Sequence, residues 1–110
     1  MPDRVSVITK LAGVVLRLGR ADEAAQLAER ATAVDPDHGE AWLVLARTRQ
    51  QQDRVDDAVA AFDRVVAVLP DDPQMWALRG QQLLKVSRVA DAAESYARAL
   101  ALAPGDTIPD

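Results

Sequence analysis

A period of 34 residues runs through the chain and constrains its fold more than any other property of the sequence. Pro36, Pro70 and Pro104 are spaced by that period, and each closes an apolar run with an acidic residue nearby. The same spacing relates Trp42 to Trp76, Phe62 to Tyr96, and the alanine sets Ala24, Ala58, Ala92 and Ala33, Ala67, Ala101. Such self-similarity is typical of stacked supersecondary units. The chain divides into repeats 5–38, 39–72 and 73–106 and a short tail, 107–110.

Each repeat contains two segments with helical periodicity. In the middle repeat, apolar residues recur at spacings of three and four on either side of a turn at Gln52-Asp53-Arg54. The equivalent turns hold Gly19 and Ser87, and all three turn residues suit such a position. Hydrophobic residues make up 49% of the chain but aromatic ones only 4%, which favours closely packed helices rich in alanine. We predict an all-α protein with helices at 3–18, 21–34, 39–52, 55–68, 73–86 and 89–102.

Residues at the predicted helix starts agree with these bounds. Asp37, with Glu40 three residues later, has the spacing of a capping-box variant. Asp72 followed by Pro73 has the pattern of an N-cap and a first helical residue. The second helix of every repeat opens with carboxylates that complement the helix dipole. These carboxylates are Asp22 and Glu23, Asp56 and Asp57, and Asp91.

A helix-turn-helix unit of this length resembles the tetratricopeptide repeat, whose pattern runs Trp, Leu, Gly/Ala, Tyr, Gly, Ala, Phe/Tyr, Ala and Pro. The middle repeat matches at Trp42, Leu45, Ala46, Ala58, Phe62 and Pro70. The third matches at Trp76, Gly80, Ala92, Tyr96, Ala99 and Pro104. The first matches at Leu11, Ala12, Gly19, Ala24, Ala31 and Pro36, with Ile8 in place of Trp and Ala28 in place of the aromatic residue. The resemblance implies a right-handed α-α superhelix of three antiparallel helix pairs, in a single domain over residues 1–110.

Two arginines depart from the family pattern. Arg49 stands at the family's Tyr place, which Val15 and Leu83 hold in the other repeats, and Arg79 stands at the Leu place of the third repeat. We expect both side chains to extend their charge from half-buried positions to solvent, so that the fold tolerates them.

The C-terminal end departs from the pattern in another way. Members of the family often add a solvating helix after the last repeat, whereas Pro104-Gly105 ends the last helix here, with no separate capping helix after it. The outer side of that helix, at Tyr96, Leu100 and Leu102, is therefore expected to be partly bare. Such a face fits either a piece of a longer array or a chain that forms a homo-oligomer through its uncapped end.

The distribution of charge is uneven between helices. The net charge of −4 argues against a nucleic-acid partner. The first helices of the repeats carry Arg4, Lys10, Arg17, Arg47, Arg49, Arg79 and Lys85 against only Asp3 and Glu40, whereas the second helices are mostly acidic. In the tetratricopeptide family the first helices line a concave groove, so the resemblance implies a basic inner wall. The residues expected to face a ligand there are Thr9, Lys10, Gly13, Arg17, Leu43, Arg47, Gln50, Gln51, Ala77, Leu78, Gln81 and Lys85.

Such a wall suits an extended peptide or a helix with carboxylates and a few apolar anchors. The plainer interpretation is that these charges are solvated surface and partners at i,i+4. Some family members hold chaperone C-termini with a Lys/Asn/Arg carboxylate clamp. Here the places of that clamp are taken by Thr9, Gly13, Val44, Gln74 and Leu78. We therefore predict no tight binding of the corresponding acidic tail.

No pattern in the sequence indicates catalysis, a cofactor or a metal site. The chain has no cysteine and no Gly-rich phosphate loop. His38, the only histidine, lies in a turn between repeats without convergent ligands. Capping explains the acid pairs Asp56-Asp57 and Asp71-Asp72 better than acid–base chemistry.

The remaining predictions concern the tryptophans and the cellular location. Trp42 and Trp76 hold helix-packing positions and are interpreted as core residues. Lys10 and Arg17 interrupt the N-terminal apolar positions, and no run is long enough for a membrane span. We expect no membrane insertion and a cytoplasmic location.

The sequence thus predicts a non-catalytic protein–protein interaction or scaffold module that binds a peptide or helix of another protein in a basic groove. Two alternatives stay open. One is a structural segment that self-associates through its uncapped end. The other is an accessory domain of a larger bacterial assembly, secretion or maturation protein, an alternative based on where the family occurs.

Overall fold

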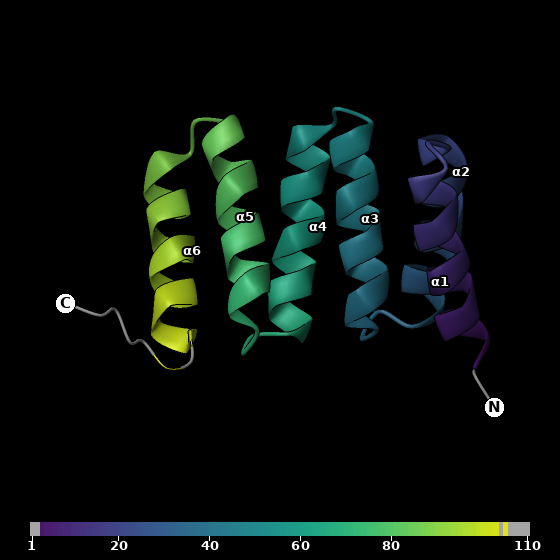
Figure 1. The fold of residues 1–110 in the computed structure, drawn as a ribbon, viewed down its shortest axis with the longest axis horizontal. Coiled ribbons are helices and arrows are strands. Elements are labelled where there is room, and N and C mark those ends of the chain that lie inside the picture. The colour runs from purple at the N-terminus through teal and green to yellow at the C-terminus, as the bar shows by residue number, and fades with distance from the viewer. Residues whose placement is uncertain (1–2, 104, 106–110) are drawn as a thin grey trace.

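The computed structural model describes residues 3–103 and 105 and shows, within them, six helices and no strand. They are α1 (Arg4–Arg17), α2 (Ala21–Val34), α3 (Gly39–Gln51), α4 (Val55–Val68), α5 (Pro73–Lys85) and α6 (Val89–Leu102). The all-α class is confirmed, and the predicted bounds are correct to within one residue at every end. Pro104 and the predicted tail, 107–110, lie outside the described residues. Figure 1 shows the helices side by side in one row, from α1 and α2 at one end to α6 at the other.

Each helix packs against its neighbours in the chain, both within a repeat and across the boundaries between repeats. We call the contact of α2 with α3 the first junction and that of α4 with α5 the second junction. At the first junction α3 also packs against α1. At the second, α5 contacts α4 and α6 and no other helix of the described chain.

The turn within each repeat has the same geometry. Gly19, Asp53 and Ser87 adopt positive φ, at 83°, 60° and 60°, as their turn positions predicted. In the first turn, the N–H of Gly19 donates to the carbonyl of Leu16 at 2.9 Å and that of Arg20 to Val15 at 3.2 Å. The equivalent bonds of the other two turns measure between 2.8 and 3.0 Å. These paired bonds form a Schellman motif, which satisfies the last carbonyls of α1, α3 and α5 and reverses the chain.

Aspartates cap two of the first helices. At α5 the carboxylate of Asp72 accepts the N–H of Gln74 at 3.0 Å and Pro73 is the first helical residue, as predicted. At α1 the carboxylate of Asp3 accepts the backbone N–H of Ser6 at 2.8 Å and the Ser6 hydroxyl at 3.0 Å. The backbone bond first, and then the hydroxyl bond, lower the pKa of Asp3.

The N-cap of α3 differs from the prediction, although the helix starts at Gly39 as predicted. Its N-cap is His38, which makes no side-chain capping bond, so the capping box predicted from Asp37 and Glu40 is wrong. Asp35 instead closes the preceding turn, because its carboxylate accepts the backbone N–H of Asp37 at 3.1 Å. Asp37 therefore belongs to the turn, and His38 is the residue that precedes α3.

A core of small aliphatic residues runs through all three repeats. Its main cluster includes Ala12 and Ala28 of the first repeat, Leu45 of the second and Met75 of the third, together with the fully buried Phe62. Because one cluster spans both junctions, the repeats bury their apolar faces against one another.

The two tryptophans pack half-buried against this cluster, which confirms their interpretation as helix-packing residues. Each also bonds to the end of the preceding repeat. The indole N–H of Trp42 donates to the carbonyl of Pro36 at 2.7 Å, and that of Trp76 donates to Pro70 at 2.8 Å. A hydrogen bond between a tryptophan and the proline six residues before it thus stabilises the turn between repeats at each junction.

A close helix contact in the third repeat requires glycine. A Cβ added to Gly80 in α5 would lie 2.8 Å from the ring of Tyr96 in α6. The glycine lets the aromatic ring lie directly on the backbone of α5, so the family's small residue at this place is explained by packing.

Arg49 and Arg79 do not extend to solvent, and that prediction is wrong. The Arg49 guanidinium pairs with Glu29 across the first junction, and that of Arg79 pairs with Asp63 across the second at 2.7 Å. Only 14% and 19% of the two arginine side chains are exposed. The acids lie one period apart, so α2 and α4 each provide a carboxylate to the helix stacked on them.

Candidate functional site

The first helices α1 and α3 enclose a hollow of about 450 Å³. It is lined by Thr9, Lys10, Gly13, Val14, Leu16, Arg17, Glu40, Val44 and Arg47. Residues three and four apart share a helix face, which brings Lys10, Gly13 and Arg17 together on α1. Gly13 has no side chain, and a Cβ there would still lie 4.0 Å from Val44 of α3, so the hollow stays open between the two helices.

A second hollow of about 450 Å³ continues from the first. It is lined by Leu16, Arg17, Arg47, Gln50, Gln51 and Lys85. Leu16, Arg17 and Arg47 belong to both hollows, so the two form one surface, which we call the groove. The groove brings together one cation from each repeat: Arg17 from α1, Arg47 from α3 and Lys85 from α5.

The groove is basic. It contains four cations, Lys10, Arg17, Arg47 and Lys85, and a single carboxylate, that of Glu40. All four cations are exposed, and none forms an ion pair within residues 3–103 and 105. Exposed, unpaired cations attract an anionic ligand without first having to break an internal ion pair.

The predicted basic inner wall is smaller in the structure than the charge count suggested. Arg49 lies two residues from Arg47, about 200° around the helix, and so points away from the groove toward Glu29. Arg79 is engaged with Asp63 in the same way. Both arginines therefore stabilise the stacking of repeats and are not part of the groove.

The structure places the other predicted groove residues unequally. Gln50 and Gln51 line the groove. Thr9 lies at its base but is buried, with its hydroxyl donating to the Val5 carbonyl at 2.8 Å, so it offers packing and no free polar group. Four predicted residues line neither hollow: Leu43 and Leu78, which pack half-buried against the core cluster, the half-buried Ala77 and the exposed Gln81.

Sequence reasoning missed four lining residues, Val14, Leu16, Glu40 and Val44. Each lies three or four residues from a predicted one on the same helix, so extending the predicted faces by one turn would have found them. Three of the four are apolar. They give the basic groove an apolar wall, a feature common in ligand-binding pockets.

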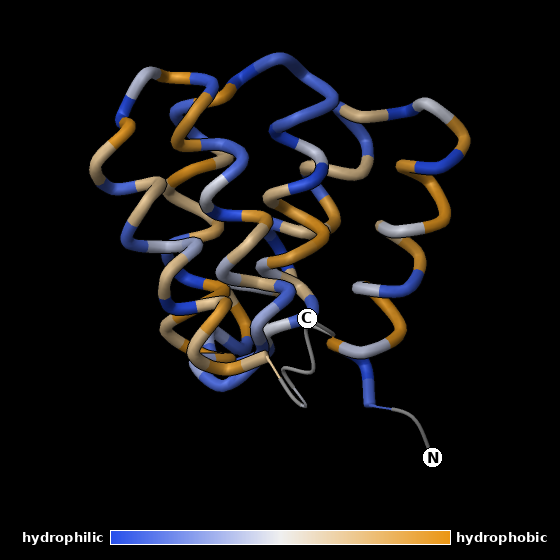
Figure 2. The backbone as a smooth tube through the Cα atoms, turned by 60° about the vertical axis from the view of Figure 1, so that its left-hand side comes forward, coloured by the Kyte–Doolittle hydropathy of each residue, from blue (hydrophilic) through white to orange (hydrophobic). Residues whose placement is uncertain are grey.

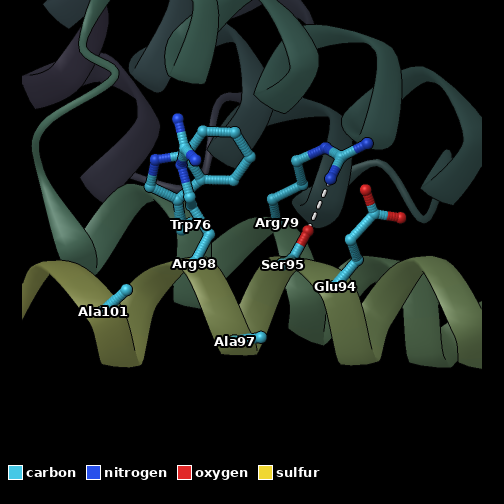
Figure 3. A pocket seen from close by; sticks show the side chains of 7 residues that line it. All are labelled: Trp76, Arg79, Glu94, Ser95, Ala97, Arg98 and Ala101. Atoms are coloured by element: carbon cyan, nitrogen blue, oxygen red, sulfur yellow. Dashed lines mark hydrogen bonds between the residues drawn. The ribbon is translucent and has the colours of Figure 1, made fainter.

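Another hollow, of about 380 Å³, lies between α5 and α6 and shares no residue with the groove. Figure 3 shows its lining, with Arg79 directed at Ser95 and Arg98 beside the Trp76 ring. The guanidinium carbons of Arg98 and Arg79 lie 5.5 and 5.9 Å from the centre of that ring. Because its arginines are already engaged with the ring, with Ser95 and with Asp63, this hollow offers fewer free polar groups than the groove.

Neither a candidate metal-binding cluster nor a membrane-spanning helix occurs in the part of the chain that the structure describes. No three histidine, aspartate or glutamate side chains are grouped there in a way that could hold a metal ion. None of its helices combines the length and apolar character that crossing a bilayer requires.

Comparison with known proteins fits the repeat and the helix pairs. The model of the tetratricopeptide repeat family matches residues 15–81, more than half of the chain. This chain belongs to the tetratricopeptide repeat family. No curated protein matches it in sequence.

Solved structures of other tetratricopeptide repeat proteins have the same fold. One of MamA is similar with a TM-score of 0.86 and 20% identity, over 96% of this chain and 61% of that one. The Yersinia enterocolitica type III secretion chaperone SycD, in complex with a peptide of the translocator YopD, is similar with a TM-score of 0.87 and 18% identity. The match covers 96% of this chain and 81% of that one. The second tetratricopeptide repeat domain of Spaghetti (RPAP3), bound to the HSP90 peptide SRMEEVD, is similar with a TM-score of 0.84 and 13% identity. The match covers 92% of this chain and 94% of that one. The chain spans 57 to 76% of the length of the MamA chains it matches.

Proposed function

We propose that this tetratricopeptide repeat chain is a non-catalytic interaction module that holds an acidic segment of a partner protein in the groove. The observation that carries the proposal is the convergence of Arg17, Arg47 and Lys85, from three different helices, on one hollow. A ligand that neutralises all three must contact every repeat, so recognition depends on the assembled array.

The chemistry of the lining suits a peptide. The guanidinium groups of Arg17 and Arg47 can bind carboxylates in a bidentate way, and Lys85 adds a point charge. The amides of Gln50 and Gln51 can both donate to and accept from a peptide backbone. Val44 and its apolar neighbours offer a place for one aliphatic side chain of the ligand.

The fold neighbours support this use of the fold without identifying the ligand. Two of these neighbours have a bound peptide, of YopD in SycD and of HSP90 in Spaghetti. At 13 to 18% identity the likeness concerns the fold alone. The places of the family's carboxylate clamp hold Thr9, Gly13, Val44, Gln74 and Leu78 here, so we propose an internal acidic segment as ligand in preference to a chaperone C-terminus.

The test uses three fluorescein-labelled peptides in an anisotropy titration: one that alternates Glu and Leu, its Lys-for-Glu counterpart, and SRMEEVD. We expect the acidic alternating peptide to bind, its basic counterpart to fail, and SRMEEVD to bind more weakly than the acidic alternating peptide. Binding should weaken as salt rises, because exposed charges are screened over about 8 Å at physiological ionic strength.

Two pairs of charge reversals locate the site. Arg47→Glu with Lys85→Glu should reduce the affinity for the acidic peptide at least tenfold. Arg30→Glu with Arg98→Glu changes the net charge equally but lies on α2 and α6, outside the groove, and should leave the affinity within about twofold. Equal losses in both double variants would show attraction to the whole protein and contradict a groove site.

A further inference from the structure

An apolar stripe on α1 is exposed in the described structure, and only Val14 at its edge also lines the groove. Val7, Leu11, Val14 and the capping residue Leu18 are between 49 and 63% exposed. Their spacing of four, three and four places them along one side of the helix. Figure 2 shows α1 at the N-terminal end of the row with apolar residues recurring along its length.

A second stripe with the same spacing lies at the other end of the row, on α6. It consists of Val89, Ala93, Tyr96 and Leu100, all exposed. Leu102, which was predicted as part of this face, lies two residues beyond Leu100, about 200° around the helix, and is half-buried. Leu102 therefore does not belong to the stripe.

The α1 stripe occupies the positions by which later first helices pack on the preceding repeat. A shift of 34 residues converts its members into Ala41, Leu45, Thr48 and Gln52 of the second repeat and Met75, Arg79, Gln82 and Val86 of the third. Those positions make the junctions. The Gln52 amide donates to Asp22 of α2 at 2.8 Å. Arg79 pairs with Asp63 of α4.

The α6 stripe occupies the positions by which earlier second helices receive the next repeat. Its equivalents on α4 are Val55, Val59, Phe62 and Val66, of which the last three are buried. Val66 belongs to one core cluster with Met75, and Val59 to another into which Val86 packs. The same positions on α6 are uncovered only because no repeat follows them within the described chain.

The charged residues that pair at the junctions are replaced by apolar residues at both ends of the array. At each junction an acid at Glu29 or Asp63 pairs with an arginine of the next helix. The equivalent of those acids on α6 is Ala97, and the equivalents of Arg49 and Arg79 on α1 are Val15 and Leu11. Acid and arginine are therefore both replaced, and a contact between the ends would bury no unpaired charge from this pair.

We propose that copies of this chain stack head to tail, with α6 of one copy on α1 of the next. The molecule contains two examples of the required contact, the first and second junctions. By analogy with Val66 and Met75, Leu100 packs near Val7, and by analogy with Val59 and Val86, Ala93 packs near Leu18. A contact of this heterologous kind does not close on itself in a dimer and adds further copies into a ring or filament.

The test is sedimentation equilibrium of the full chain and two variants over micromolar to millimolar concentrations. Leu11→Glu places a charge in the α1 stripe and Leu100→Glu places one in the α6 stripe, both at exposed positions, so the monomer fold is retained. We expect the mean mass of the original chain to rise beyond a dimer with concentration, and each variant alone to stay monomeric. An equimolar mixture of the two should form a dimer and stop, since one intact α6 meets one intact α1.

A matched control is Val34→Glu, at a residue of α2 that is 70% exposed and belongs to neither stripe; it should assemble like the original chain. A chain that stays monomeric at every concentration would overturn the proposal. A Leu11→Glu chain that still dimerises would show α6 meeting α6, and a Leu100→Glu chain that still dimerises would show α1 meeting α1. Loss of assembly in Val34→Glu would indicate unspecific association. Peptide binding is measured separately on the same variants, whose groove cations are unchanged, so stacking and groove binding can fail independently.

Discussion

The two junctions of the array connect equivalent elements but hold them differently. At the first, α3 packs on both helices of the preceding repeat, whereas at the second α5 packs on α4 alone among the helices that precede it. The acids Glu29 and Asp63 are equivalent, but their partners are not: Arg79 corresponds to Leu45, one helical turn from Arg49. The apolar contacts and the tryptophan hydrogen bonds therefore repeat with the 34-residue period, whereas the ion pair of each junction uses an arginine at a different position of the repeat.

The groove reflects this difference. One of its hollows is made by α1 and α3 alone, and α5 adds only Lys85 to the other. The contact between α1 and α3 thus provides most of the groove. The third repeat contributes only the charge of Lys85 to the groove.

The largest expected effect comes from the residue that connects both junctions. Phe62→Ala removes a fully buried ring from the cluster that spans the repeats and should lower the free energy of unfolding by about 3–5 kcal/mol. Tyr96→Ala, at the equivalent position of the last repeat, should cost clearly less because 38% of that residue is exposed. Urea denaturation followed by circular dichroism measures both, and equal losses would contradict the difference between an inner and an end repeat.

A second prediction asks whether the third repeat opens alone. Gly80→Ala drives a Cβ into the Tyr96 ring and should cost about 1–3 kcal/mol, less the gain in helix propensity. Amide hydrogen exchange should speed up in α5 and α6 and not in α1 and α2, because neighbouring repeats are only locally coupled. Gly13→Ala is the matched control: its Cβ meets only Val44, at 4.0 Å, and should stabilise the chain by about 0.5–1 kcal/mol.

A third prediction separates the two junction arginines. Arg79→Met removes the guanidinium group that donates to the fully buried Ser95 hydroxyl, and should cost about 1–3 kcal/mol. Arg49→Met leaves the half-exposed Glu29 to water and should cost about 1 kcal/mol or less. Adding Ser95→Ala to Arg79→Met should recover part of the loss in thermal or urea unfolding. If Ser95→Ala recovers nothing, the buried hydroxyl is not the source of the difference.

The smallest effect should be the same at both junctions. Trp42→Phe and Trp76→Phe each keep a ring and remove the indole hydrogen bond to a proline carbonyl, at an expected cost of about 0.5–1.5 kcal/mol. Equal losses in the free energy of unfolding, measured in urea, would support a hydrogen bond that stabilises both junctions to the same extent. A loss at only one tryptophan would show that the junctions differ there too.

The sequence predicted the helices well because their signals are local. The turn residues Gly19, Asp53 and Ser87 and the N-cap of α5 follow from the chemistry of a few neighbouring positions. The cap predicted at Asp37 failed because His38 is the N-cap of α3, while Asp35 accepts the backbone N–H of Asp37 in the preceding turn. Local chemistry with two nearby aspartates does not decide which residue becomes the N-cap.

Of the candidate site, the sequence predicted which helix faces carry the lining but not which neighbour each side chain meets. The resemblance to the family predicted Lys10, Arg17, Arg47 and Lys85 on the groove face of the first helices, and they line the groove. It could not show that Arg49 pairs with Glu29, because that contact depends on how α2 lies against α3. The spacing of four, three and four in the α1 stripe was visible in the sequence, yet only the position of α1 at the end of the row shows that the stripe is uncovered.

The groove is tested most directly by an NMR titration of the ¹⁵N-labelled chain with the acidic alternating peptide. We predict that the amide signals that shift belong to the first helices, with the largest changes around Arg17, Arg47 and Gln51 and smaller ones near Lys85. Shifts concentrated instead on α2, α4 and α6, or around the hollow beside Trp76, would contradict a ligand site on the first-helix face.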